Sequence, residues 1–212
     1  MKQFLVIVLM LGMLMKTTKA QDKGASYMDW KLLPSLPDSF GFAGAFAGVS
    51  NNVLLVAGGA NFPDGGAPWT GSTKVWYDKV FALDKPGGQW KEAGKLPKPL
   101  GYGVSLTWKD AMVCIGGSDA AGHHAESFLV RYNNGKIETE KLPSLPHPLA
   151  NGSGVLIGNK AFVIGGTATP QSSEASNVCW SLDLSAEKDQ QKWVTEKSFP
   201  GPSRILAVTG TL

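Results

Sequence analysis

Side chains that could bind a ligand follow two glycine pairs and one proline turn of this 212-residue chain. The candidates are Asn61, Asp64, Ser118, Asp119, His123, His124 and Arg204. An arginine guanidinium can hold a carboxylate through two parallel hydrogen bonds, so Arg204 is the candidate for binding an acidic group. Asn61 offers an amide to ligand hydroxyl groups, and Asp64 and His123 complete the predicted ligand-binding set.

Each of these residues also has a structural explanation. Arg204 could instead bond backbone carbonyls between repeats, and Asn61 could serve its own loop. Asp64 stands beside Gly65-Gly66, a pattern typical of a solvated turn. The residue types therefore leave both interpretations open.

His123 and His124, with Asp119 nearby, raise the question of a metal site. Adjacent histidine side chains point in different directions, and no further ligand is spaced to complete a tetrahedral set. The pattern favours an exposed loop pair, and we expect neither a metal nor an organic cofactor. A copper oxidase is disfavoured because no set of Tyr, Cys and His has ligand spacing.

The glycine pairs end short apolar segments that recur along the chain. Gly58-Gly59, Gly116-Gly117 and Gly165-Gly166 follow such segments, and their first glycines are 58 and 49 residues apart. A period near fifty with one such strand per period indicates kelch-type β-propeller blades. Glycine at a strand end allows backbone angles and close approaches that other residues avoid.

Each repeat predicts four antiparallel strands. The expected strands are 41–49, 53–57, 74–83 and 89–90, then 101–108, 111–115, 126–132 and 136–141, then 152–157, 160–164, 177–184 and 192–197. Residues 203–212 predict the inner strand of a fourth blade. Because strands alternate in direction, loops after the glycine pairs share one face with the turns that enter the inner strands. That face would hold the candidate site.

Three tryptophans mark a second repeated element. Trp30, Trp90 and Trp193 each stand six residues before a Leu-Pro or Phe-Pro step. The pattern predicts an outer strand that carries Trp, followed by a proline turn. We expect these side chains to pack between blades and not to form a platform for sugars.

Three blades with one leading and one trailing strand cannot close a propeller, and an open array leaves unpaired sheet edges. We therefore expect residues 21–212 to be an incomplete all-β kelch propeller domain, part of a six-bladed protein of roughly 300 mature residues. The alternative is self-association through the open edges into a dimer.

Residues 1–20 have the features of a signal peptide. Lys2 precedes an apolar stretch over 4–15, which is too short to span a bilayer comfortably. Thr18 and Ala20 place small residues at −3 and −1 of a cleavage site. We expect a periplasmic or secreted protein with no membrane attachment after cleavage; the alternative is an uncleaved N-terminal anchor.

Without these residues the chain has 17 basic and 17 acidic residues, because the leader contains three lysines and no acid. Nucleic-acid binding requires a basic surface, so that class is excluded. The two cysteines, Cys114 and Cys179, each lie in an apolar strand. Export permits a disulfide, but buried free thiols are the favoured interpretation.

The first repeat carries the most specific pattern. Gly41-Phe-Ala-Gly-Ala-Phe-Ala-Gly-Val-Ser50, followed by Leu54-Leu-Val-Ala-Gly-Gly-Ala-Asn61-Phe62, resembles the N-acetylneuraminate epimerase (sialic acid mutarotase) family. Residues 145–204 resemble the beginning of that family. The order is therefore similar to that of the cyclically permuted mutarotases, and the likeness covers about residues 26–212.

The resemblance implies interconversion of the α and β anomers of sialic acid without metal or organic cofactor. That family uses a Glu and an Arg in a loop beginning Asn-Gly-Glu as its proposed catalytic pair. In the permuted order this loop is expected beyond Leu212, so no catalytic residue is assigned and we expect the chain to lack its main catalytic groups. The alternative is a kelch carbohydrate- or protein-binding module without catalysis.

Overall fold

The computed structural model describes residues 30–211, so the predicted signal peptide lies outside the described residues. The chain divides into two compact units, residues 1–32 and 33–212. Residues 30–32 of the first unit contain no strand. No helix among residues 30–211 is long and apolar enough to cross a membrane.

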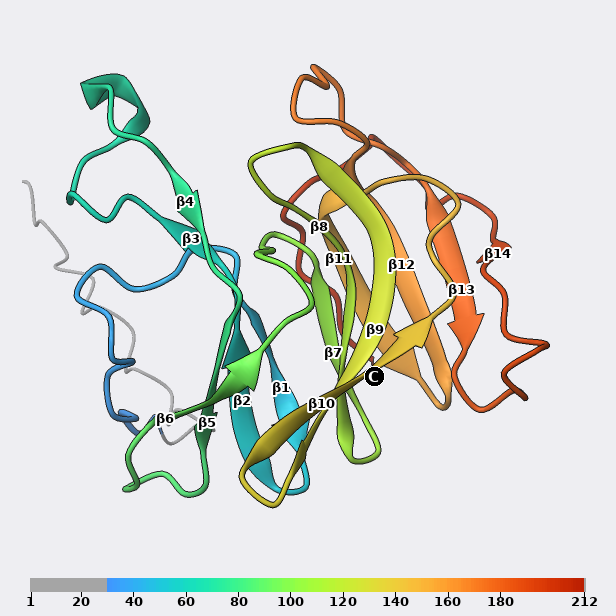
Figure 1. Ribbon diagram of the computed structural model, residues 1–212. Helices are drawn as coiled ribbons and strands as arrows, with labels where there is room; N and C mark the ends of the chain where they lie inside the picture. The colour runs from blue at the N-terminus through green and yellow to red at the C-terminus, as the bar shows by residue number, and fades with distance from the viewer. Residues whose placement is uncertain (1–29, 212) are drawn as a thin grey trace, which may run out of the picture. The chain divides into compact units, whose positions relative to one another are not determined.

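The second unit contains three four-stranded antiparallel sheets (Figure 1). The first is formed by β1 (Phe46–Ser50), β2 (Val53–Ala57), β5 (Lys79–Leu83) and β6 (Lys91–Lys95). The second is formed by β7 (Val104–Trp108), β8 (Ala111–Ser118), β9 (His123–Asn133) and β10 (Lys136–Leu142). The third is formed by β11 (Ala150–Ile157), β12 (Lys160–Thr167), β13 (Cys179–Asp183) and β14 (Val194–Thr195). The predicted all-β repeats of four strands are confirmed, but the fourth strand of the first repeat is β6 and not the expected 89–90, which form no strand.

One expected strand, 74–83, is divided in two. Its second part is β5, whereas its first part, β4 (Val75–Trp76), pairs with β3 (Ala60–Asn61) in a separate ribbon. The left-handed backbone at Gly58 and Gly59 interrupts the ladder between these two pairings. A loop with one 3-10 turn, Pro68–Thr70, connects β3 to β4.

The predicted strand over 203–212 is wrong in the described residues, because 203–211 form no strand. This segment does run beside β11. Leu206 donates its backbone N–H to Asn151 O at 2.9 Å, and the Thr209 hydroxyl donates to Gly154 O at 2.7 Å. Such isolated bonds between neighbouring repeats do not make a ladder, and no second strand among residues 30–211 pairs with the segment.

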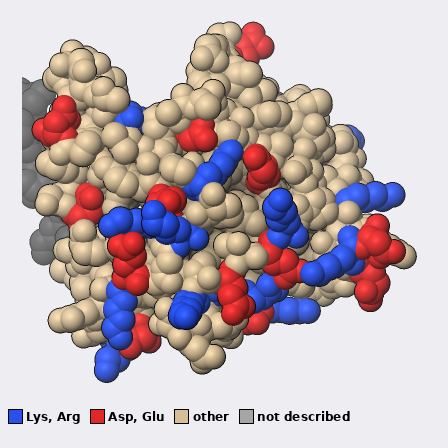
Figure 2. All heavy atoms as spheres, viewed as in Figure 1, with Lys and Arg blue, Asp and Glu red and all other residues tan. Residues whose placement is uncertain are grey.

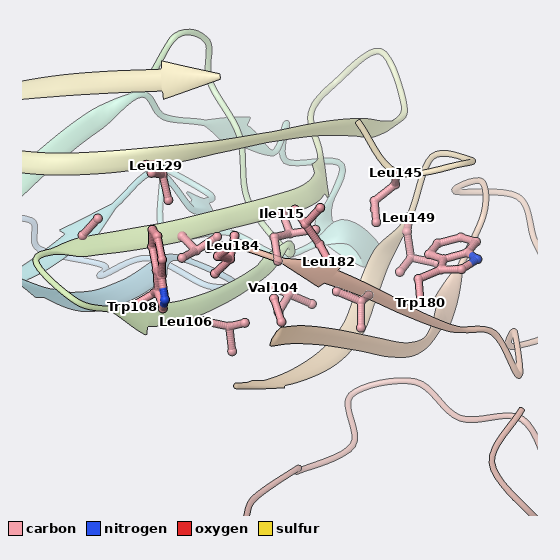
Figure 3. Packing of buried hydrophobic residues seen from close by; sticks show 14 residues of the cluster. Val104, Leu106, Trp108, Ile115, Leu129, Leu145, Leu149, Trp180, Leu182 and Leu184 are labelled. Atoms are coloured by element: carbon pink, nitrogen blue, oxygen red, sulfur yellow. The ribbon is translucent and has the colours of Figure 1, made fainter. Parts of the chain in front are cut away.

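The inner strands of neighbouring sheets lie side by side. The backbone N–H groups of Ala47 and Val49 in β1 donate to the hydroxyl groups of Ser105 and Thr107 in β7, at 3.1 and 3.0 Å. Two apolar clusters fill the spaces between successive sheets. Strand β8 contributes to both, because its successive side chains point to opposite faces. Ile115 packs toward Leu182 of the third sheet (Figure 3), and Val113 and Trp180 belong to the same cluster.

The glycine pairs join each repeat to the next. Gly117 donates its N–H to Leu149 O at 2.8 Å, and Gly59 and Gly166 make the same bond to Leu100 O and Arg204 O, also at 2.8 Å. A Cβ on Gly116 would lie 2.5 Å from Leu149 O, and the φ angle of Gly116 is +60°. Glycine is therefore required at that position by both the backbone conformation and the close approach of the next repeat.

The predicted packing of the tryptophans between blades is confirmed at one position, Trp193. Trp90 donates its indole N–H to Pro34 O at 2.8 Å, and Trp193 donates to Pro143 O at 2.9 Å. Each bond ties an outer segment to the chain that enters the same sheet. Trp193 also packs against the buried cluster between the second and third sheets, whereas Trp30 is exposed.

Cys114 and Cys179 are both free thiols. Cys114 is fully buried in the cluster between the first two sheets, and burial raises the pKa of its thiol. Cys179 lies in β13 and is half-buried; burial and the nearby Glu196 raise the pKa of its thiol as well. The favoured interpretation of two unpaired thiols is confirmed.

Candidate functional site

A hollow of about 340 Å³ lies where the loops after the glycine pairs meet the entrances to the inner strands. It is lined by polar and ionisable residues from all three repeats: Lys74, Tyr102, Ser118, His123, Asn151 and Thr167. Ile205, the neighbour of Arg204, closes part of its wall. This is the face that the alternation of strands predicts.

His123 begins β9 and belongs to a small polar network in the hollow. Its Nε2 lies 3.1 Å from the hydroxyl of Thr167, and the Asn151 amide nitrogen lies 3.4 Å from the same hydroxyl. Nδ1 of His123 is buried and has no hydrogen-bond partner in the described structure. Partial burial lowers the pKa of His123, so the imidazole is held neutral near pH 7. A neutral imidazole can accept or donate a proton.

Lys74 supplies the positive charge of the hollow. Its ammonium lies 4.2 Å from the ring centroid of Tyr102 and 5.2 Å from that of Trp76. The part of the chain that the structure describes provides no carboxylate partner for it. An ammonium held over aromatic faces without a counter-ion is available to bind an anionic group of a ligand.

The four substrate-binding candidates lie in different places. His123 lies in the hollow with Lys74. Arg204 is exposed and its guanidinium lies over the Phe199 ring at 5.6 Å. Its backbone is what joins the repeats, because its N–H and C=O bond to Ser176 and Gly166. Ile205 therefore lies in the wall of the hollow, whereas the Arg204 side chain does not.

The side chain of Asn61 is hydrogen-bonded to neighbouring residues of the first repeat. Its amide donates to Asp38 and to Gly41 O, at 3.1 and 2.8 Å, and its amide oxygen accepts a bond from the Tyr77 hydroxyl at 2.8 Å. It lines a second hollow of about 300 Å³ that shares Lys74 and Tyr102 with the first.

Asp64 is an exposed turn residue whose carboxylate accepts the Gly66 N–H at 3.0 Å. This bond and one with Ser72 lower the pKa of Asp64.

His124 points away from His123 into an ionic cluster. Its Nε2 lies 2.8 Å from Asp119 Oδ2, its Nδ1 lies 2.7 Å from Lys98 Nζ, and Glu126 lies at the edge. The expectation that the two histidines diverge is confirmed, but the predicted exposed loop pair is wrong, because both residues lie in β9 and are partly buried. No group of three His, Cys, Asp or Glu residues within 30–211 is arranged to hold a metal ion.

Charges on the viewed face are mixed. Lys and Arg side chains alternate with Asp and Glu in Figure 2. The described structure contains paired charges, for example Lys79 with Glu92 at 2.9 Å and Arg131 with Glu140 at 2.6 Å. Lys74 differs from these lysines because its neighbours are aromatic rings.

The lining residues that sequence reasoning missed include Lys74, Tyr102, Asn151 and Thr167. A signal for two of them exists. Tyr102 and Asn151 each stand 14 residues before the first glycine of their pair, as does Gly44 in the first repeat. Lys74 has no corresponding spacing from a glycine pair, because its position depends on the β3–β4 ribbon.

Comparisons with known proteins agree with this architecture. A family model described as N-acetylneuraminate epimerase matches residues 3–139, more than half of the chain. The N-acetylneuraminate epimerase of Yersinia pestis (strain Pestoides F) is 40% identical over 109 residues, and that of Salmonella enteritidis PT4 (strain P125109) is 44% identical over 105 residues. These alignments cover 47% and 44% of this chain but 27% of each relative. The chain thus matches about a quarter of the length of these curated relatives.

A solved structure, titled Structure of YjhT, superposes with a TM-score of 0.67 at 15% sequence identity. The superposition covers 86% of this chain and 59% of that chain, and it supports the β-propeller fold. The permuted order of the repeats stays a prediction. The family match includes the Phe-Ala-Gly segment of the first repeat and extends through β9, which carries His123. By this match, the chain belongs to the N-acetylneuraminate epimerase family.

Proposed function

We propose that this chain binds N-acetylneuraminate in the hollow lined by Lys74, His123 and Asn151, and takes part in interconversion of its anomers. The observation that carries the proposal is Lys74, an ammonium without a carboxylate partner in the described structure, held over two aromatic rings at the edge of the hollow. The family supports the choice of sugar, since the matched relatives are named N-acetylneuraminate epimerases.

The chemistry of the hollow suits an acidic sugar. N-acetylneuraminate has a carboxylate on its anomeric carbon, and Lys74 can bind that group as a point charge. The Asn151 side-chain oxygen has no hydrogen-bond partner among the described residues, so it can accept a bond from a hydroxyl or an amide N–H. Both contacts would fix the anomeric centre relative to His123.

Anomer exchange requires proton transfer at two oxygens. One group removes the proton of the anomeric hydroxyl, another protonates the ring oxygen, and the ring opens and closes again. His123, neutral near pH 7 and bonded to Thr167, is suited to one of these transfers. The second is assigned to the glutamate of the Asn-Gly-Glu loop that the resemblance implies; residues 1–212 contain no such sequence.

We place the reaction in the periplasm or outside the cell. The support is the pattern of residues 1–20, in which a positive residue precedes a short apolar stretch and a site with small residues at −3 and −1. Expression of the whole chain, followed by mass determination of the exported product, tests this. A product that begins at Gln21 supports export, and retention of Met1 at the membrane opposes it.

The test of binding is saturation-transfer NMR with N-acetylneuraminate, using the chain and its Lys74→Met variant. Lys109→Met is the matched control, since Lys109 also lies over an aromatic ring, 4.5 Å from Trp108, but outside the hollow. The proposal expects Lys74→Met to lose the signal and Lys109→Met to keep it. No signal from the unmodified chain would contradict the proposal.

The test of catalysis is proton NMR of freshly released α-N-acetylneuraminate, with a curated relative as the positive control. Faster appearance of the β anomer supports the epimerase assignment. Binding without acceleration would instead favour the alternative function, a kelch carbohydrate-binding module.

A further inference from the structure

Four residues at the entrances of the inner strands form a hydrogen-bonded ladder across the repeats. Tyr102 N–H donates to Gly44 O at 2.7 Å, and Asn151 N–H donates to Tyr102 O at 2.8 Å. Leu206 N–H continues the series to Asn151 O at 2.9 Å. We call this set, Gly44, Tyr102, Asn151 and Leu206, the entrance ladder.

All four residues of the entrance ladder have a left-handed backbone. Their φ angles are +63°, +60°, +58° and +51°, in chain order. Residues with a Cβ avoid this region, and tyrosine and leucine are especially unfavourable there. The hydrogen bonds between repeats therefore maintain a left-handed backbone that tyrosine and leucine side chains disfavour. Strain of this kind is a recognised sign of a functional position.

The entrance ladder directs side chains toward ligand-binding space. Tyr102 and Asn151 both line the hollow that contains His123. Their backbone N–H and C=O groups are occupied by the ladder, so their side chains can differ without changing the connection between repeats. At these two positions the ladder thus fixes the backbone that carries the side chains lining the hollow.

Tyr102 positions the lysine of the site. Its ring packs so closely on the first repeat that a Cβ on Gly44 would lie 2.6 Å from Tyr102 Cδ1. The same ring carries the Lys74 ammonium 4.2 Å from its centroid. Because the backbone of Tyr102 is fixed by two hydrogen bonds, the ring gives Lys74 a fixed place at the hollow.

We propose that two members of the entrance ladder, Tyr102 and Asn151, set the ligand specificity of the hollow. Tyr102 is a positioning residue that holds Lys74 for the carboxylate of a sugar acid. Asn151 provides the amide that contacts a hydroxyl or N-acyl group of the same sugar. The identity of the ligand rests on the proposed function, whereas the role of Tyr102 toward Lys74 does not.

Glycine substitutions test this, since glycine keeps the left-handed backbone while removing the side chain. Tyr102→Gly and Asn151→Gly are compared with Tyr102→Phe, which keeps the ring, and with Asn134→Gly. Asn134 is a matched control because it has a φ of +48° in the β9–β10 hairpin, away from the hollow. Thermal unfolding checks that each variant folds.

The first readout is affinity for N-acetylneuraminate and for a neutral N-acetylated hexosamine. Asn151→Gly and Tyr102→Gly are expected to bind the acid about tenfold more weakly, while Tyr102→Phe and Asn134→Gly bind as the unmodified chain does. Tyr102→Gly should also lose preference for the acid over the neutral sugar. Unchanged affinity in both glycine variants of the ladder would overturn the proposal.

The second readout does not depend on a ligand. The side-chain resonances of Lys74, observed by NMR after 13C-methylation of lysines, should show a ring-current shift. That shift should persist in Tyr102→Phe and decrease in Tyr102→Gly, where only the ring of Trp76, 5.2 Å from the ammonium, still contributes. If the unmodified chain binds neither sugar, the proposed function fails, and the Lys74 shift alone decides whether Tyr102 positions the lysine. A shift that is unchanged in Tyr102→Gly refutes the positioning role.

If Tyr102→Gly or Asn151→Gly does not fold, Asn151→Asp replaces them for the affinity test. Aspartate also tolerates the left-handed region, and it puts a negative charge beside the expected carboxylate. Binding of the acid should weaken more than binding of the neutral sugar. Equal effects on both sugars would count against the ladder as the source of specificity.

Discussion

The ammonium of Lys98 lies 2.7 Å from Nδ1 of His124. An ammonium can only donate, so this contact requires a lone pair on Nδ1 and places the imidazole proton on Nε2. Nε2 in turn lies 2.8 Å from Asp119 Oδ2. Lys98 comes from the segment that links the first two sheets, and Asp119 from the loop after the second glycine pair. The three side chains thus fasten that loop to the neighbouring repeat.

Replacement of Asp119 should change how the free energy of unfolding depends on pH. Burial raises the pKa of Asp119, but hydrogen bonds from His124 and from the Ala121 N–H, together with the charge of Lys98, lower it overall. A carboxyl with a lowered pKa stabilises the fold above its unfolded pKa of about 3.9, and that contribution is lost as the pH falls through the folded pKa.

We therefore expect Asp119→Asn to lower the free energy of unfolding at pH 7 by about 1–2 kcal/mol. The difference from the unmodified chain should shrink as the pH falls below about 3.9. Urea unfolding at several pH values measures this. The exposed Asp189 is the control, and Asp189→Asn should change stability by less than about 0.5 kcal/mol at each pH. A pH-independent deficit for Asp119→Asn would argue against an ionic role.

A buried hydroxyl connects the hairpin turns of the first two repeats. Ser50 is fully buried; it donates to Asp110 O at 2.5 Å and accepts the backbone N–H of Tyr132 at 2.8 Å. Ser50→Ala leaves both backbone groups unsatisfied, so we expect a loss of about 2–3 kcal/mol in the free energy of unfolding. Denaturant unfolding of Ser50→Ala beside the exposed Ser173→Ala checks this. Equal midpoints for the two variants would show that the hydroxyl contributes nothing.

The local chemistry of the repeats could be predicted from sequence. Asn51 and Asn52 form a turn with φ angles of +49° and +62°, as the Asn-Asn pair indicates. The strand before each glycine pair was also predictable, since it is short, apolar and followed by glycines. These signals are local, and the structure contains them at the expected positions.

The site was harder to predict, because its residues are brought together by bonds between repeats. Arg204 stands at the predicted edge, yet its backbone joins the repeats while its side chain lies over Phe199. Tyr102 and Asn151 come together through backbone hydrogen bonds that leave no composition signal. Lys74 reaches the hollow only because β4 pairs with β3. The spacing of 14 residues before a glycine pair would have identified Tyr102 and Asn151, but not Lys74.

The two thiols should differ in reactivity. Cys114 is completely buried in an apolar cluster, whereas Cys179 is half-buried and its backbone carbonyl accepts the Glu196 N–H at 2.8 Å. Because thiolate is the reactive form and burial raises both pKa values, we expect slow alkylation of Cys179 in the folded protein. Cys114 should react only in denaturant.

Mass spectrometry after iodoacetamide treatment, with and without urea, distinguishes the two sites. An unfolded, unreduced sample that resists alkylation at both cysteines would reveal a disulfide and contradict the free-thiol structure. Cys179→Ser provides the control, since it leaves one thiol that should stay unmodified until the protein unfolds.

Gly116 of the second glycine pair can be compared with Gly158, a turn glycine. The two have the same backbone conformation, but the space around their Cα atoms differs. Gly116 and Gly158 have φ angles of +60° and +59°. A Cβ on Gly116 would lie 2.5 Å from Leu149 O, whereas a Cβ on Gly158 would meet nothing within 4 Å. Gly158→Ala should therefore cost only the left-handed conformation, about 1–2 kcal/mol.

Gly116→Ala must in addition move the next repeat away, which weakens the bond from Gly117 N–H to Leu149 O. We expect it to cost at least about 2 kcal/mol more than Gly158→Ala, the range of a lost buried hydrogen bond with local repacking. Denaturant unfolding of both variants measures the difference. Equal losses would mean that the glycine pair is required only for its backbone angles; a larger loss at Gly116 would show that it serves as the contact point between successive repeats.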